Sequence, residues 1–171
     1  MRAEAQEEYV EYVTGRLAPL RQLAFLLCGD EHRADDVVQQ TIEKLYLRWP
    51  RVSAVEHLDR YVRQMLVRTF IDERRRPWAR VGLTGRAPEP PPPPAPTGPH
   101  DAVEDTLVLR AALARVPRRQ QAVLVLRYLC DLPVDEVAAI LNCSAGTVKS
   151  QSSRGLATLR KLVGDDLQRT V

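Results

Sequence analysis

The chain has 171 residues, which suffices for one ordinary domain or for two small domains joined by a tether. Hydrophobic residues make up 44 % of the chain but aromatic residues only 5 %, which disfavours cores built on large rings and favours small helical bundles of Leu, Val and Ala. The net charge of +3 does not by itself indicate a nucleic-acid partner. However, seven Arg and only two acids lie between Arg60 and Arg80, which predicts a face that attracts phosphate.

The sequence lacks the features of metal-binding or redox proteins and those of secreted or membrane-spanning proteins. The three cysteines are widely spaced and form no CxxC pair of the kind that binds zinc or exchanges disulfides, so we expect ordinary buried thiols, no metal and no cofactor. No apolar signal core stands at the start, and no run approaches the roughly 18 apolar residues that span a bilayer. These features predict a soluble cytoplasmic protein.

The first part of the chain has the apolar periodicity of three helices. Their predicted ranges are 8–27, 34–49 and 55–75, and the residues expected to end them are Gly29 with Asp30, then Pro50, then Pro77. Asp35 and Asp36 fall in the first turn of the second helix, where the helix dipole favours acids. In the third predicted helix the apolar periodicity places Thr69 on the side that faces the core. Residues 1–80 are therefore expected to form a three- or four-helix bundle.

A proline-rich segment separates this part from the rest. Eight of the twelve residues from Pro88 to Pro99 are Pro, which excludes a helix or sheet and predicts an extended, semi-rigid linker over 81–102. A plain spacer is the simplest interpretation, and a proline-dependent docking site for another protein is the alternative. Beyond it, amphipathic helices are predicted over 103–115 and 118–128, separated by Pro117 at a helix start.

The segment 133–154 has the pattern of a helix-turn-helix. Asn142 tolerates the left-handed conformation of a tight turn between helices, and the Ser144 hydroxyl can cap a new helix. In that helix Val148 and Leu156 face the core, which leaves a polar set largely free: Thr147, Lys149, Ser150, Ser152, Ser153 and Arg154. Hydroxyls and two cations without acids suit a helix in a DNA major groove. A merely solvated helix is the alternative.

At these residues the chain resembles a known family. The sequence from 113 to 162, LARVPRRQQAVLVLRYLCDLPVDEVAAILNCSAGTVKSQSSRGLATLRKL, closely resembles domain 4 of extracytoplasmic-function sigma factors, with GTVKS followed by R and LR as the most recognisable signature. HRADDVVQQTIEKLYLRW resembles the helix of domain 2 that grips the RNA polymerase clamp. YVRQMLVRTFIDERRRPW resembles the segment that opens and reads the −10 promoter element. The resemblance is nearest to an actinobacterial, sigma-E-like subgroup.

The resemblance implies an all-α protein of two small domains and a non-enzymatic function. Domain 2 would cover 1–80 and domain 4 would cover 103–171, with the linker 81–102 between them. The family directs core RNA polymerase to promoters: domain 2 docks on the clamp of the largest subunit and domain 4 on the flap of the second largest subunit. Promoter DNA is the other expected partner. Because relatives are often held inactive by a membrane-linked anti-sigma factor, such a protein is a further candidate partner.

The resemblance also assigns site residues. Polymerase binding falls on Asp35, Asp36, Gln39, Gln40 and Glu43. Contact with the −10 element falls on Arg60, Arg63, Gln64, Arg68, Thr69, Asp72, Arg74 and Arg75. Contact with the −35 element falls on Thr147, Lys149, Ser150, Ser153 and Arg154, with Arg118, Arg119 and Arg127 as phosphate ligands.

Three residues depart from the family pattern. Gln40 stands where the family usually has Glu, which predicts a weaker charge pairing with the clamp. Arg68 stands where an Asn is expected, which leaves the identity of the selected −10 base open. Pro133 replaces a Ser cap, which alters the start of one helix but not the face expected to meet the groove.

Two other classes of protein compete with this interpretation. A stand-alone repressor or activator also carries a helix-turn-helix, but it usually dimerises to match a two-fold operator, and no dimer face or ligand pocket is evident. An enzyme would have to use acids and histidines that are loosely spaced, such as His32, Asp35, Asp36 and Glu43. No nucleophile elbow and no glycine-rich phosphate loop occurs.

Three aromatic residues allow a contact with DNA or a purely structural role. Tyr46 and Trp49 are expected to pack in the core or at an interface. Trp78 follows the arginine-rich segment, so stacking on DNA is the alternative to packing there.

Overall fold

The computed structural model describes residues 3–73 and 100–169, with the backbone alone described over 100–105 and 166–169. Every regular element in these ranges is helical, so the all-α prediction is confirmed. The proline-rich linker, Arg74, Arg75 and Trp78 lie outside the described residues. We call 3–73 the N-terminal half and 100–169 the C-terminal half.

The N-terminal half consists of three helices, α1 (Ala3–Cys28), α2 (Glu31–Val52) and α3 (Leu58–Asp72). The turn predicted after α1 is confirmed: Gly29 has a φ of +69°, which a residue with a side chain rarely adopts, and its N–H donates to the Phe25 carbonyl. Asp30 then caps α2, because its carboxylate accepts from the Arg33 N–H at 2.8 Å. A single tight connection therefore sets α1 against α2.

Pro50 does not end the second helix, as the sequence predicted. It lies inside α2, which continues to Val52, and the Ser53 N–H still donates to the Trp49 carbonyl at 2.9 Å. The φ of proline is itself helical, and Pro50 is exposed in the last turn, where water can replace the one missing hydrogen bond. A second difference from the prediction lies at the same end of the bundle. The third helix, α3, begins at Leu58 and not at residue 55, because residues 53–57 form a turn.

The C-terminal half contains α4 (His100–Arg115), α5 (Arg118–Leu124), a π-helical turn η3 (Val125–Leu129), α6 (Val134–Leu141) and α7 (Ala145–Arg169). Pro117 precedes α5 as predicted. The helix predicted over 118–128 changes its pitch halfway, because the Cys130 N–H donates to the Val125 carbonyl at 2.9 Å, five residues back.

The helix-turn-helix is formed by α6 and α7, and its turn is confirmed in detail. Asn142 is left-handed with a φ of +51°, and the Ser144 hydroxyl accepts from the Thr147 N–H at 3.1 Å. Further along α7, Gly155 lies against α5 so closely that an added Cβ would stand 3.1 Å from the Leu124 side chain. The small residue allows α7 to cross α5 at short range, which fixes the orientation of its exposed face.

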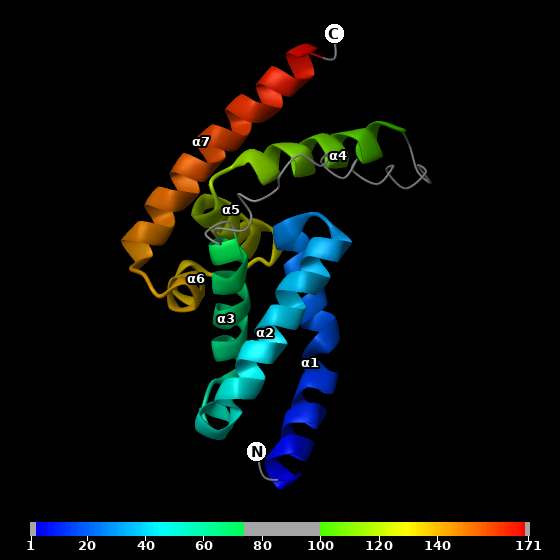
Figure 1. Ribbon diagram of the computed structural model, residues 1–171. Coiled ribbons are helices and arrows are strands. Elements are labelled where there is room, and N and C mark those ends of the chain that lie inside the picture. The colour runs from blue at the N-terminus through cyan, green and yellow to red at the C-terminus, as the bar shows by residue number, and fades with distance from the viewer. Residues whose placement is uncertain (1–2, 74–99, 170–171) are drawn as a thin grey trace, which may run out of the picture.

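The two halves also pack on each other (Figure 1): α3 contacts α5 and α6, and the C-terminal part of α1 approaches η3. Their buried residues form one continuous apolar cluster that includes Leu27 and Phe70 from one half and Val123 and Leu126 from the other. The sequence predicted two domains at the ends of a tether. In the structure their cores touch.

Candidate nucleic-acid interface

The exposed face of α7 carries the residues expected to read duplex DNA. Lys149, Ser150, Ser153 and Arg154 are all exposed, and their spacing of three and four residues places them on one side of the helix. Thr147, at the start of this face, is half-buried, and its hydroxyl lies 2.9 Å from the capping Ser144 hydroxyl. The face therefore combines two cations with several hydroxyls at the N-terminal end of a helix, where anions are favoured.

Ser152 does not belong to this face, although the sequence placed it there. Its side chain is 8 % exposed and its hydroxyl lies 3.1 Å from the phenol oxygen of Tyr128 in η3. The contact depends on a residue 24 positions earlier in the chain, so it could not be recognised from the helical period of α7 alone.

A second polar face runs along α3. Arg60, Gln64, Arg68 and Asp72 follow each other every four residues, and all except the half-buried Gln64 are exposed. Neither Arg60 nor Arg68 forms an ion pair with any residue in 3–73 or 106–165. We call these four residues the α3 stripe. Two guanidinium groups without partners on one exposed stripe suit the backbone of a nucleic acid.

Thr69 is buried, so the expected contact between its side chain and DNA is not available in this conformation. It is 3 % exposed, its hydroxyl donates to the Met65 carbonyl at 2.9 Å, and it accepts from the Lys44 ammonium at 2.8 Å. The apolar period of the sequence predicted this inward orientation correctly. The residue links α3 to α2 instead of facing outward.

Three further arginines expected to contact DNA are engaged inside the protein. Arg63 donates to the Glu136 carboxylate on α6 at 3.1 Å. The Arg118 side chain, only 14 % exposed, stands 4.4 Å above the Phe70 ring and 3.6 Å from the Glu73 carboxylate. Arg127 donates to the Leu132 carbonyl at 2.6 Å, which holds the loop before α6. Of the three predicted phosphate ligands of the C-terminal half, Arg119 alone is fully exposed.

The residues expected to bind polymerase lie on the outer side of α2. Asp36, Gln39 and Glu43 are exposed and Gln40 is half-buried. The Gln39 amide donates to the Glu43 carboxylate at 3.3 Å. Asp35 is exposed as well, but both of its carboxylate oxygens accept from Arg21 of α1, at 2.9 and 3.0 Å. The acidic face is therefore present, with one of its acids already paired.

Leu47 continues this face, although the sequence did not single it out. Its side chain is 80 % exposed, four residues after Glu43, and the neighbouring Tyr46 is 43 % exposed with its ring 5.2 Å from that of Tyr9. Leu47 and Tyr46 therefore add exposed apolar surface beside the acidic residues. The signal was weak, because a leucine in an amphipathic helix normally predicts a core position. Trp49, by contrast, is buried as expected.

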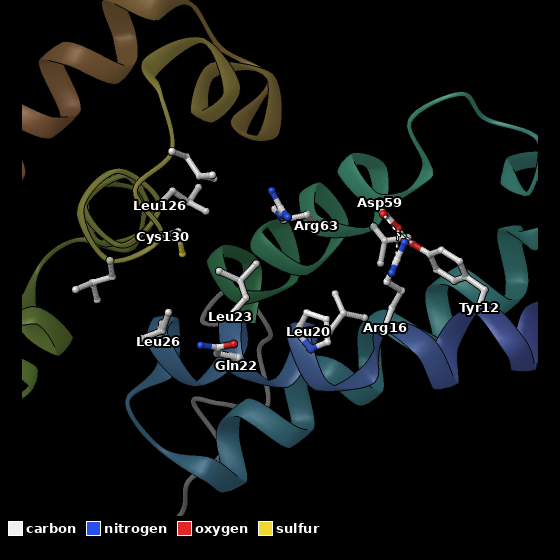
Figure 2. Close-up of a pocket in the computed structure, with 14 residues that line it drawn as sticks. Tyr12, Arg16, Leu20, Gln22, Leu23, Leu26, Asp59, Arg63, Leu126 and Cys130 are labelled. Atoms are coloured by element: carbon white, nitrogen blue, oxygen red, sulfur yellow. Dashed lines mark hydrogen bonds and ion pairs between the residues drawn. The ribbon is translucent and has the colours of Figure 1, made fainter.

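A polar cluster on the other side of the bundle joins α1 to α3. The Arg16 guanidinium donates to both carboxylate oxygens of Asp59, at 2.8 and 2.9 Å, and Tyr12 donates to the same carboxylate at 2.8 Å (Figure 2). The hydrogen bonds from Arg16 hold the pKa of Asp59 below its usual range. Burial raises the pKa of Tyr12, and the bond to Asp59 adds to that shift.

The His, Cys, Asp and Glu side chains of the described residues are too dispersed to form a metal site. No group of three His, Cys, Asp or Glu side chains within them comes close enough to hold a metal ion. Cys28 is buried, which raises the pKa of its thiol to about 11, and Cys130 and Cys143 are half-buried free thiols. Among the helices described, none is long and apolar enough to cross a bilayer.

Comparison with known proteins identifies the family of this chain. Residues 13–80 match the description of Sigma-70 region 2 and residues 106–159 that of Sigma-70 region 4. The chain is 34 % identical over 165 residues to the RNA polymerase sigma-E factor of Streptomyces coelicolor, covering 94 % of this chain and 89 % of that protein. This chain belongs to the extracytoplasmic-function sigma factors. It is also 32 % identical to the sigma-E factor of Streptomyces avermitilis, over 90 % of this chain and 84 % of that one, which agrees with the subgroup predicted from sequence.

Solved structures of sigma factors share the fold. The sigma factor RpoE in its co-crystal structure with the anti-sigma factor NepR from Bartonella quintana aligns over 92 % of this chain and 98 % of its own, with a TM-score of 0.65 and 22 % identity. CnrH in complex with the cytosolic domain of CnrY aligns over 96 % and 95 %, with a TM-score of 0.61. The likeness extends over both halves, so this sigma factor has the helical architecture of these neighbours throughout.

Proposed function

We propose that this sigma factor binds core RNA polymerase through α2 and places α3 and α7 on the two elements of a promoter. The observation that carries the proposal is the pair of exposed faces, the α3 stripe and the exposed face of α7, whose cations form no ion pair within the described residues. These faces lie in two halves that match sigma regions 2 and 4. The polymerase performs the chemistry, and the sigma factor contributes binding and orientation in the cytoplasm, where the polymerase acts.

On the −35 element, α7 lies in the major groove. Lys149 and Arg154 reach base edges or phosphates, while Ser150 and Ser153 supply shorter hydrogen bonds, and Arg119 supports the adjacent backbone. The Ser144 cap supports this role because it fixes the first turn of α7, whose N–H groups point toward the groove. Gly155 supports it as well, since the close crossing of α5 and α7 leaves the groove-facing side free.

On the −10 element, the α3 stripe follows the melted strand. Arg60 and Arg68 hold the phosphates, and Gln64 and Asp72 are placed to hydrogen-bond bases. Arg74 and Arg75 lie outside the described residues and remain candidates for further phosphate contacts. Unpaired bases held by side chains do not need a groove, so a convex helix surface is sufficient. Domain 2 (1–80) is then the part that captures single-stranded DNA.

Core polymerase contacts the outer side of α2. Asp36, Gln39, Gln40 and Glu43 give a polar, acidic face suited to a basic coiled coil, and electrostatic attraction would speed the encounter. Leu47 adds an apolar side chain at the end of this face, and its removal from water by a partner would contribute favourably to the binding free energy. Because Gln40 has no charge, the apolar contact of Leu47 would supply a larger share of the binding free energy.

An anti-sigma factor is the second partner that we propose. The neighbours RpoE and CnrH were solved with the anti-sigma factor NepR and with CnrY, respectively, and both align with this chain over both halves. The acidic and apolar face of α2 and the basic faces of α3 and α7 are the surfaces that such an inhibitor would have to cover to prevent transcription.

Run-off transcription tests the proposal. Purified core polymerase is incubated with fragmented genomic DNA of the source organism, with and without the sigma factor. Discrete transcripts that require the sigma factor and share two upstream motifs are expected, and their yield should fall steeply with salt because phosphate contacts release counterions. The absence of transcripts, together with no co-purification of core polymerase, would instead indicate a stand-alone DNA-binding regulator.

A further inference from the structure

One acid, Asp72, stands among the basic and amide side chains of the α3 stripe. It is exposed, and it is the last residue of α3, where the helix dipole disfavours a carboxylate. Its side chain forms no hydrogen bond or ion pair with any residue in 3–73 or 106–165. By contrast, three other acids of this half each pair with an arginine: Asp35, Asp59 and Glu73. No contact within the described fold accounts for the Asp72 carboxylate, so its partner has to be sought outside the protein.

Arg68 lies one helical turn before Asp72, about 6 Å along the helix axis, and is also exposed. Opposite charges at this spacing attract each other, yet the guanidinium and the carboxylate form no ion pair with each other. The two groups can therefore bind different parts of one nucleotide. The cation suits a phosphate, and once Arg68 and Arg60 neutralise the nearby phosphates, a carboxylate can approach a base without being repelled by the strand.

A carboxylate can only accept hydrogen bonds, so it distinguishes bases by the donors that they offer. On its Watson–Crick edge guanine has two adjacent donors, N1–H and the N2 amino group, which match the two carboxylate oxygens. Adenine and cytosine each offer one amino group on this edge, and thymine offers one N3–H. In a duplex the two guanine donors are bound to cytosine. A carboxylate that reads them therefore requires a strand that has opened.

We propose that Asp72 selects an unpaired guanine in the −10 element through these two donors, while Arg68 holds the adjacent phosphate. This inference rests on the promoter function proposed above and adds the base that one position of the promoter presents. Because the donors are exposed only in melted DNA, the same contact favours the opened strand over the duplex. Asp72 thus couples the choice of base to the opening of the promoter.

Fluorescence anisotropy tests the proposal on the full chain bound to core polymerase. The probes are short single-stranded thymidine oligonucleotides with one central guanine, adenine or cytosine, and core polymerase alone gives the background. The guanine probe should bind at least about fivefold tighter than the other probes, since a good bidentate contact discriminates by this much or more. Inosine, which lacks the N2 amino group, should lose most of the preference. By contrast, 7-deazaguanine keeps the Watson–Crick edge and lacks only N7, so it should bind as tightly as guanine.

The variant Asp72→Asn separates base reading from charge. Its amide has one donor and one acceptor, the pattern that pairs with adenine, so the variant should bind the adenine probe at least as tightly as the guanine probe. The loss of a negative charge should also strengthen binding of the plain thymidine probe slightly. The melting temperature should not fall, because the replaced side chain is exposed. Asp135→Asn is the matched control: it makes the same change at an exposed acid of α6 that has no ion pair within the described residues, and it should keep the guanine preference.

The outcomes separate this proposal from the promoter function. Equal affinity of the unchanged protein for all probes would overturn the guanine selection while leaving single-strand capture intact. The same conclusion would follow if Asp72→Asn shifted every probe equally and kept the guanine preference, since Asp72 would then act through charge alone. A preference abolished in 7-deazaguanine would assign the reading to an arginine at N7. If the complex binds no probe more tightly than core polymerase alone, capture of the −10 strand itself fails, and the selection of guanine fails with it.

Discussion

The two basic faces of the molecule are built in different ways. The exposed face of α7 follows from local sequence: a left-handed Asn142, a capping Ser144 and a helix that begins immediately after them. The outer surface of α3 depends on long-range packing, because Thr69 turns inward to Lys44 and Arg63 is paired with the opposite half. A face fixed by its own turn keeps its residues exposed, whereas one shaped by packing gives up some of them to neighbouring elements. In this sigma factor the packing of α3 leaves the α3 stripe exposed, while Thr69 and Arg63 hold the fold together.

The largest expected effect comes from the two cations of α7. The double variant Lys149→Ala with Arg154→Ala should reduce promoter-directed transcription by at least about 30-fold, since each contact is worth about 1–3 kcal/mol. Its melting temperature should not change, because both side chains are exposed and make no ion pair within the described residues. Lys161→Ala, further along the same helix, serves as the control. Transcription equal to that of the control would remove this face from the DNA.

A smaller effect, on stability, is expected at the crossing of α5 and α7, which supports the exposed face of α7. Gly155→Ala places a Cβ 3.1 Å from the Leu124 side chain and 3.3 Å from Gln120, so the crossing of α5 and α7 must widen at a cost of about 1–3 kcal/mol. Chemical denaturation measures the loss. Gly164→Ala in the same helix has no neighbour within 4 Å and should instead stabilise by up to about 1 kcal/mol through helix propensity. Equal effects of the two variants would mean that α5 and α7 are not closely packed.

Adjacent residues of α3 should respond in opposite ways. Arg68→Ala should leave the melting temperature unchanged and weaken binding to single-stranded −10 DNA several-fold, since a contact of about 1 kcal/mol is lost. Thr69→Val should do the reverse: it removes the buried hydroxyl that accepts from Lys44, at a cost of about 1 kcal/mol in unfolding free energy, without changing DNA affinity. A loss of DNA affinity in Thr69→Val without a loss of stability would show that α3 presents a different side to the promoter.

The same contrast explains which features the sequence could predict. Helix order, the turn at Asn142 and the cap at Ser144 depend on residues close in the chain, so local propensities were sufficient. Pro50 misled because proline tolerates a last helical turn when its neighbours are solvated. Ser152 was misplaced and Leu47 was missed for a common reason, since a helical period indicates which side of the helix a residue occupies but not which partner covers it. Tyr128 buries Ser152, and nothing in the described structure covers Leu47. Between the two halves, the Arg63–Glu136 and Gln121–Leu27 contacts join residues 73 and 94 positions apart, so neither had a local signal in the sequence.

The smallest expected effect concerns the cluster that fixes α3 against α1. Hydrogen bonds from Arg16 lower the pKa of Asp59 in the folded protein relative to about 3.9 in the unfolded chain, so the carboxylate stabilises the fold above that pH. This contribution is lost as the pH falls through the lower, folded pKa. Asp59→Asn should therefore melt slightly below the unchanged protein at pH 7, and the difference should shrink as the pH falls below about 3.9. The effect is small because both charged side chains are about half exposed, at 50 % and 52 %. A difference that does not shrink in this acidic range would assign the stabilisation to packing and not to charge, and α3 would then be positioned by its apolar side alone.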